Sequence, residues 1–148
     1  MRITRIILPL AMALVFGAAA LAAAGKPVIV MNGTEKWGKP DMGMQTAVLY
    51  GNPDSTGFYV IRLKLGPNWN FPVHYHPTQE NVTVISGTFY AGIGDKFDKS
   101  KASAFPAGSF ASLPPNLKHF AFTKSSGAVI QIEGMGPEKD IMVKGGKM

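Results

Sequence analysis

The sequence predicts an all-β domain, and two observations carry that prediction. Glycine and proline are frequent, with 17 and 11 residues among 148, and they interrupt the chain every few residues. Between them lie short segments, and the clearest one, residues 58–65, alternates apolar with polar side chains. A period of two is typical of a half-buried strand. Many short strands in a chain of this length indicate a β-sandwich or a small closed barrel.

The composition fits one globular domain, which we expect over residues 25–148. An apolar fraction of 46% excludes a disordered chain. The net charge is +6, or +4 without the two arginines near the N-terminus, and the lysines are scattered rather than clustered. We therefore expect no nucleic-acid partner. Cysteine is absent, which excludes disulfides, a thiol nucleophile and a cysteine-ligated zinc site.

Residues 1–24 have the layout of a secretory signal peptide. Arg2 and Arg5 form a basic start, residues 6–16 are apolar, and residues 22–24 offer an Ala-x-Ala cleavage site. We expect export across the inner membrane to the periplasm, with no stable membrane anchoring after cleavage. An uncleaved anchor is the alternative, because residues 6–24 are long enough to span a bilayer.

The expected strands follow one another with turn residues between them. Apart from 58–65, the pattern predicts strands at 47–50, 81–86, 88–93, 109–113, 118–123 and 128–133, and a short apolar run at 28–31. Gly87 is expected to turn the chain between two of these strands and so make a hairpin. Residues 95–104 are polar and fit a helical turn or a loop.

Two short segments hold all three histidines of the chain. His74 and His76 are two residues apart, which on a strand places both side chains on one face with Cα atoms about 7 Å apart. Two imidazoles so placed can reach one ion. His119 follows a Pro-Pro-Asn turn and shares a face with Leu117 and Ala121, so we expect it to point inward as well.

Glu80 begins an expected strand and is in register with Val82 and Val84. A carboxylate on an apolar face points into the core, where an ionised group is costly unless it is paired or metal-bound. A lone histidine, or an H-x-H pair alone, is explained as well by a hydrogen-bonded core residue. The coincidence of three inward histidines with an inward glutamate favours a divalent transition metal with one or two open positions.

Two motifs of this chain resemble the conserved motifs of the cupin superfamily. The first is Gly66…His74-x-His76-x3-Glu80-x6-Gly87, and the second is Gly108-x5-Pro114-x-Asn116-x2-His119. The resemblance covers about residues 47–133. Seven residues separate Gly66 from His74 where the usual pattern has five, and Asn116 stands where the second motif usually has glycine. Asparagine tolerates the same left-handed turn.

The resemblance implies a jelly-roll β-barrel, also described as a double-stranded β-helix, that is often a homodimer. It also implies one divalent metal, Mn, Fe, Ni or Zn, bound by His74, His76, Glu80 and His119. The expected function is a metal-dependent enzyme, an oxygenase such as a dioxygenase, a decarboxylase or an isomerase, acting on a small oxygen-rich molecule. Two alternatives stay open: a non-catalytic periplasmic module that binds or senses a small ligand, and a purely structural metal site.

Several other residues are weaker candidates. Met42 and Met44 could be soft ligands for copper, together with two later methionines. Gln131 could donate to a substrate. Four aromatic residues could line the barrel mouth, although aromatics at strand spacing are core residues by default: Tyr59, Trp69, Phe71 and Tyr90. No general acid or base is assigned, because every acidic residue except Glu80 and Glu133 falls in an expected loop.

Overall fold

The structure is a computed structural model, and it describes residues 25–144. The expected signal peptide, residues 1–24, lies outside the described residues. Within the described part, no helix is long and apolar enough to span a bilayer. The strands are β1 (Met44–Tyr50), β2 (Gly57–Leu65), β3 (Asn70–Tyr75), β4 (Glu80–Ile93), β5 (Ser103–Pro106), β6 (Phe110–Leu113), β7 (His119–Phe122), β8 (Ala128–Gly136) and β9 (Ile141–Met142), with one 3-10 turn, η1 (Lys99–Lys101).

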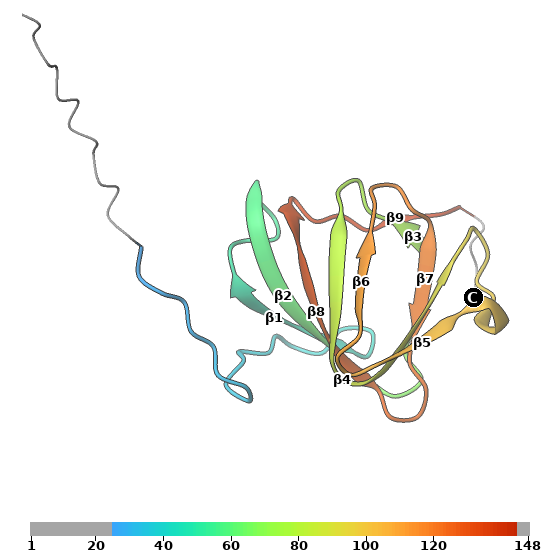
Figure 1. Cartoon of the computed structure of the whole chain (residues 1–148), viewed down its shortest axis with the longest axis horizontal. Coiled ribbons are helices and arrows are strands. Elements are labelled where there is room, and N and C mark those ends of the chain that lie inside the picture. Colours follow the sequence, from blue (N-terminus) through green and yellow to red (C-terminus); the bar gives the residue numbers. More distant parts are fainter. Residues whose placement is uncertain (1–24, 145–148) are drawn as a thin grey trace, which may run out of the picture.

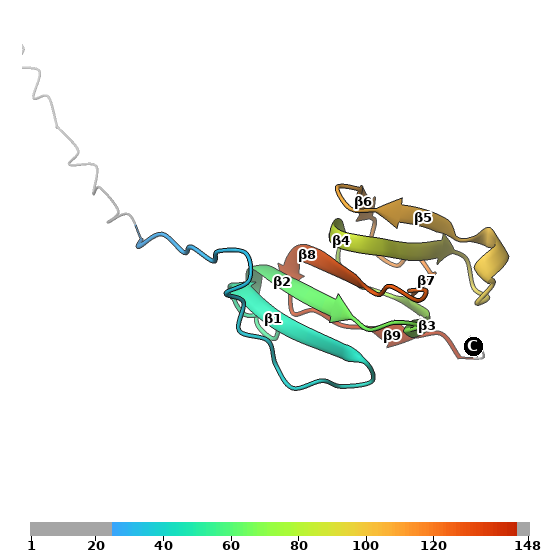
Figure 2. The same ribbon diagram turned by 90° about the horizontal axis from the view of Figure 1, so that it is seen from below.

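Two antiparallel sheets share the long strand β4 (Figure 1). The first sheet has the order β1-β2-β8-β4-β6, and the second has the order β5-β4-β7-β3-β9. Figure 2 shows the strands curling from β1 and β2 through β8 and β4 toward β3 and β9. The curl wraps the sheets around a common interior, so the all-β barrel predicted from the sequence is confirmed.

A single strand passes through Gly87, so the hairpin expected there is wrong. Residues up to Gly87 pair with β8 in the first sheet, and residues Thr88 to Ile93 pair with β5 and β7 in the second. Gly87 has a φ of 74°, and a Cβ atom there would lie 2.5 Å from the carbonyl oxygen of Gly127. Only glycine accepts both the positive φ and the close approach. The glycine bends β4 around a corner of the barrel and does not reverse the chain.

The alternation in β2 is confirmed, since Tyr59, Ile61 and Leu65 are buried and Phe58 is exposed. The strands expected at 47–50, 109–113, 118–123 and 128–133 also form, as parts of β1, β6, β7 and β8. The apolar run 28–31 does not become a strand, and its side chains are exposed. That segment has no partner in the ladders of the described residues, and backbone pairing is what sustains a short strand.

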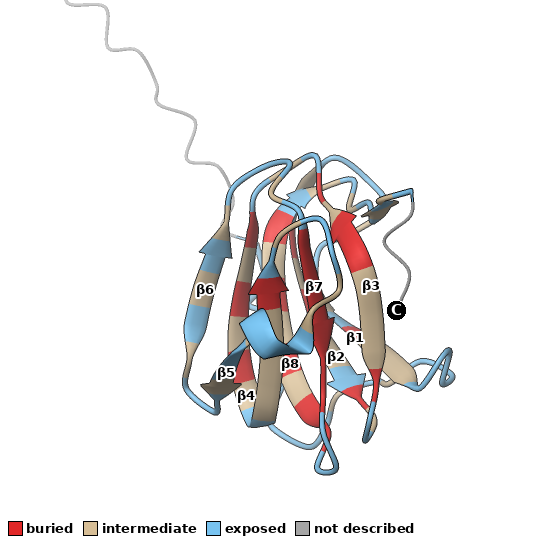
Figure 3. Cartoon of the chain, turned by 90° about the vertical axis from the view of Figure 1, so that its right-hand side faces the viewer, coloured by how far each residue is buried: buried red, intermediate tan, exposed pale blue. Residues whose placement is uncertain are grey.

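Strand β7 is buried on both faces (Figure 3), unlike β2, which alternates buried with more exposed residues. Ala121 belongs to the core inside the barrel. Phe120 and Phe122 point the other way and form a second cluster with Val73. Phe97 and Ala102, on either side of η1, pack over that cluster and exclude water from it. This covering holds β7, and with it His119, firmly in place.

Candidate metal centre

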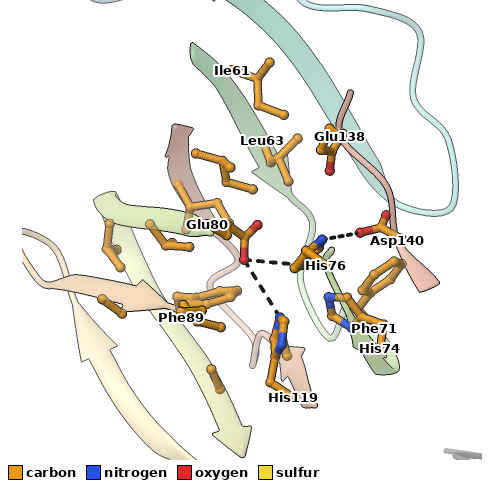
Figure 4. A pocket seen from close by; sticks show the side chains of 18 of the residues that line it. Ile61, Leu63, Phe71, His74, His76, Glu80, Phe89, His119, Glu138 and Asp140 are labelled. Atoms are coloured by element: carbon orange, nitrogen blue, oxygen red, sulfur yellow. Dashed lines mark ion pairs between the residues drawn. The ribbon is translucent and has the colours of Figure 1, made fainter. Parts of the chain in front are cut away.

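The three histidines converge from two neighbouring strands. His74 lies on β3 and is directly paired with His119, the first residue of β7. His76 follows one residue after the end of β3. Their ring centroids are 4.2 to 5.2 Å apart, and one nitrogen from each ring lies within 4.8 Å of the other two. All three side chains are buried, so the trio forms a group that could hold a metal ion (Figure 4).

A backbone carbonyl oxygen faces the Nδ1 atom of each ring. His74 Nδ1 lies 2.8 Å from the oxygen of Pro72, His76 Nδ1 lies 3.1 Å from that of Lys139, and His119 Nδ1 lies 2.9 Å from that of Leu117. A carbonyl oxygen only accepts hydrogen bonds, so each Nδ1 must carry the hydrogen and donate it. The Nε2 atoms therefore keep their lone pairs, and the tautomers suit metal binding through Nε2.

Glu80 lies beside two of the three rings, and it is not part of the group whose ligand atoms all lie within 4.8 Å of one another. Its Oε2 atom lies 3.4 Å from His76 Nε2 and 3.9 Å from His119 Nε2 (Figure 4). His76 Nε2 is buried and has no hydrogen-bond partner among the described residues. A lone pair facing a carboxylate oxygen needs a cation or a proton between them. Two ligands held about 2.1 Å from one ion lie about 3.0–3.4 Å apart, which is close to the observed separation from His76.

Burial sets the protonation of the four residues when no ion is present. It lowers the pKa of His74 to about 3, with a further contribution from the neighbouring His119. It also lowers the pKa of His119 below the usual value for imidazole. Burial, together with the carboxyl groups of Glu138 and Asp140, raises the pKa of Glu80 to about 8. His74 and His119 are thus neutral at pH 7, while Glu80 keeps a proton that a metal ion would displace.

No protein-family model matches the sequence, and no curated protein matches it either. Solved structures do. The polyketide cyclase RemF from Streptomyces resistomycificus matches with a TM-score of 0.62 and 16% identity over 80% of this chain and 87% of its own. An RmlC-like cupin from Shewanella frigidimarina matches with a TM-score of 0.59 and 15% identity over 75% of this chain and 93% of its own.

The chain has the cupin fold. A third similar structure is the oxalate decarboxylase of Bacillus subtilis, described as having Mn(II) centres, with a TM-score of 0.56 and 16% identity. That match covers 74% of this chain and 30% of the decarboxylase chain. The jelly-roll barrel expected from the two motifs is therefore confirmed.

Two acidic residues beside this site were not predicted from the sequence. Asp140 Oδ1 lies 3.4 Å from His76 Nδ1. Both acidic residues, Asp140 and Glu138, line a cavity inside the barrel that the three histidines and Glu80 also line. Burial, with the neighbouring Asp140, raises the pKa of Glu138 to about 7. Both residues lie between β8 and β9, and pairing of β9 with β3 brings them to His76. Their stretch looked like a polar chain end in the sequence, and no local pattern signalled this pairing.

Only some of the weaker candidates from the sequence lie near the histidines. Trp69 and Phe71 line the cavity that the four ligand candidates face, as expected for the barrel mouth. Tyr59 is a core residue, and Tyr90 stacks on Phe122 outside the barrel interior. Gln131 lies on the other side of the sheet, where it accepts from Arg62 and donates to Glu133. Among the methionines considered for copper, only Met44 lines the cavity, while Met42, Met135 and Met142 are exposed.

Proposed function

We propose that this cupin is an exported, metal-dependent enzyme that acts on a small organic molecule. One divalent transition metal would be held by the Nε2 atoms of His74, His76 and His119 and by the carboxylate of Glu80. Export rests on residues 1–24 and is tested by the N-terminal sequence of the protein recovered from the periplasm. A retained Met1 would contradict it.

The observation that carries the proposal is the set of three Nδ1–H donors bound to backbone carbonyls. A buried histidine kept only for packing would also hydrogen-bond one ring nitrogen, but three such rings would not gather one nitrogen each within 4.8 Å of the others and beside a buried carboxyl group. The Nδ1 atom of each ring is held by a backbone carbonyl oxygen. The orientation of the rings therefore does not depend on the position of another side chain. The site is therefore organised before any ion binds.

All four ligand candidates line one cavity. An ion on them would face the cavity, so a substrate could reach it, whereas a purely structural site would be closed. A bound divalent ion supplies Lewis-acid polarisation of an oxygen atom. Glu138 lines the same cavity and is the candidate to hold or accept a proton there, in the role that the sequence left unassigned. Asp140 is placed to orient His76 through Nδ1.

The neighbours in structure support catalysis without identifying the reaction. They include proteins described as a polyketide cyclase and an oxalate decarboxylase. Both act on organic molecules, by different chemistry. The shared feature is a cupin barrel, which leaves a non-catalytic binding module as the second candidate because the cavity would serve binding equally well.

The first test is elemental analysis of protein purified from the periplasm, with the variants Glu80→Gln and His119→Ala. We expect about one transition-metal ion per chain in the natural protein, and a loss of at least tenfold in affinity for both variants. Glu133→Gln is the matched control, since Glu133 hydrogen bonds to Gln131 on the other face of the sheet. Unchanged metal content in His119→Ala would contradict the proposal.

The second test separates an enzyme from a binding module. Metal-loaded protein is incubated with a panel of organic acids, enols and diols, and both oxygen uptake and product formation are followed. Turnover that is lost in the His119→Ala variant supports an enzyme. Binding with no turnover under any of the four expected metals would favour the binding module.

A further inference from the structure

The cavity that the four candidate metal ligands line is apolar over most of its wall. Its volume is about 310 Å³, at the lower end of the range for small-molecule pockets, about 300–1,000 Å³. Five aromatic residues contribute to the wall, and aliphatic side chains of the core supply most of the remainder. The aromatic residues are Trp69, Phe71, Phe89, Phe105 and Phe110.

The apolar wall of the cavity extends up to the candidate metal ligands, with no polar zone in between. Trp69 and Phe71 stack with centroids 5.5 Å apart and planes 6° apart. Phe71 then meets His74 edge-on, with centroids 4.5 Å apart. A ligand whose polar atoms reached the Nε2 atoms would thus have its adjoining atoms against aromatic rings. Such a wall stabilises carbon-rich groups and gives no hydrogen bonds to additional oxygen atoms.

The charged residues around the cavity are all acidic. Asp54, Glu80, Glu138 and Asp140 line it, and no described residue that lines it is a lysine or an arginine. The only arginine in the described part of the chain is Arg62, which forms an ion pair with Glu35 away from the cavity. No guanidinium is therefore available in the described site to hold a second carboxylate by paired hydrogen bonds.

We propose that the site takes a ring-sized organic ligand with an apolar body and one chelating end that is neutral or singly charged. The proposal rests on the proposed function, since the chelating oxygens would bind the metal. It narrows the expected substrate from a small oxygen-rich molecule to an amphipathic one. Small dianions such as oxalate are disfavoured, because a divalent ion with the Glu80 carboxylate has only a single net positive charge. The excess negative charge of a dianion would lie in a cavity lined by Glu138 and Asp140, with no lysine or arginine among the described residues that line it.

Three probes test the apolar body and the low charge of this ligand class separately. Acetohydroxamate and benzohydroxamate carry the same pair of chelating oxygens with at most one negative charge, and benzohydroxamate adds a phenyl ring. Oxalate chelates through two oxygens but carries two charges. Each is titrated by calorimetry into the mature chain loaded with zinc, which is redox-inactive, and zinc content is measured again afterwards to exclude stripping.

We expect benzohydroxamate to bind at least about tenfold more tightly than acetohydroxamate, because the phenyl ring leaves water for the aromatic wall. Oxalate should bind more weakly than acetohydroxamate. In a Trp37→Phe background Trp69 is the only tryptophan, so its fluorescence should change when benzohydroxamate enters. Equal affinities for the two hydroxamates, or tighter binding of oxalate, would overturn the inference.

Matched variants assign each effect to its residue. Phe110 lines the cavity but is 63% exposed, so Phe110→Ser should fold and should reduce the preference for benzohydroxamate. Phe58→Ser is the control, since Phe58 is also exposed and does not line the cavity. Glu138→Gln should strengthen oxalate binding about tenfold, while Glu133→Gln should not. No difference within either pair would contradict the assignment.

The outcomes distinguish this inference from the proposed function. Failure to take up zinc overturns the metal site itself. One zinc per chain with no binding of any probe overturns the open site, and with it the ligand. One zinc per chain with equal affinities for acetohydroxamate and benzohydroxamate would agree with the metal-dependent function and would contradict only the amphipathic ligand.

Discussion

The backbone N–H of Asn116 donates a hydrogen bond of 2.8 Å to the carbonyl oxygen of His76. This bond joins the end of the first histidine segment to the turn that precedes His119. Asn116 has a φ of 64°, in the left-handed region that the sequence analysis expected for this position. The relative position of the two histidine segments therefore depends on a backbone conformation that few residues adopt.

Asn116→Gly should keep both stability and metal affinity, because glycine adopts this φ without strain. Asn116→Val should reduce the free energy of unfolding by about 1–2 kcal/mol, since a β-branched residue is strained there. Urea denaturation and zinc titration of both variants measure these effects. Equal behaviour of the two variants would show that the turn conformation does not matter for the site.

Gly87→Ala should destabilise the barrel more than its φ alone would cause. The added Cβ would lie 2.5 Å from the carbonyl oxygen of Gly127, so the corner of β4 must move. We expect a loss of about 3 kcal/mol, combining left-handed strain with local overpacking. Gly108→Ala is the control, because Gly108 has a similar φ of 87° but no atom within 4 Å of the added Cβ. Similar losses in both variants would contradict the role of close packing.

The inward position of the candidate ligands was predictable because the signals for it are local. The spacing of His74 and His76, and the register of Glu80 with Val82 and Val84, require only the period of a strand. The left-handed turn at Asn116 could be predicted for the same reason. Each of these features depends on residues close together in the chain.

Features that depend on distant pairing were not predictable. The corner at Gly87 arises because Gly127 packs against it, 40 residues away, and a glycine between two strand patterns looks the same in a hairpin. Glu138 and Asp140 reach the site only because β9 pairs with β3. The burial of β7 on both faces depends on the segment around η1 folding over Phe120 and Phe122.

Zinc binding at pH 7 should release about one proton, and the proton should come from Glu80. The pKa of this carboxyl group is about 8 without metal, whereas His74 and His119 are already neutral. Calorimetry in buffers of different ionisation enthalpy measures the number released. Glu80→Gln should bring it close to zero and Glu133→Gln should leave it unchanged; release of a proton by Glu80→Gln would assign it to another group.

The stability of the metal-free protein should be greatest in a narrow window centred at about pH 5 and should fall on both sides of it. The pKa of His74 falls from 6.5 to about 3 on folding, so the unfolded chain binds more protons between these values and acid favours unfolding. The pKa of Glu80 rises from 4.5 to about 8 and that of Glu138 to about 7, so the folded chain binds more protons and stability declines as pH rises.

Urea denaturation at several pH values tests this window. Between pH 6.5 and 8 we expect the metal-free protein to lose on the order of 2 kcal/mol. Excess zinc should remove the part of that loss that belongs to Glu80, because Glu80 is then ionised and bound at both pH values. A loss that zinc leaves undiminished would show that Glu80 does not control it.

The most direct test of the metal centre is to observe the nitrogen atoms of the three histidine rings. Long-range ¹H–¹⁵N spectra of ¹⁵N-labelled protein report the protonation and ligation of each nitrogen during zinc titration. The account predicts that Nδ1 of His74, His76 and His119 keeps its hydrogen throughout, while all three Nε2 signals shift together and saturate at one zinc per chain. Ligation through any Nδ1, or an Nε2 that does not respond, would contradict it.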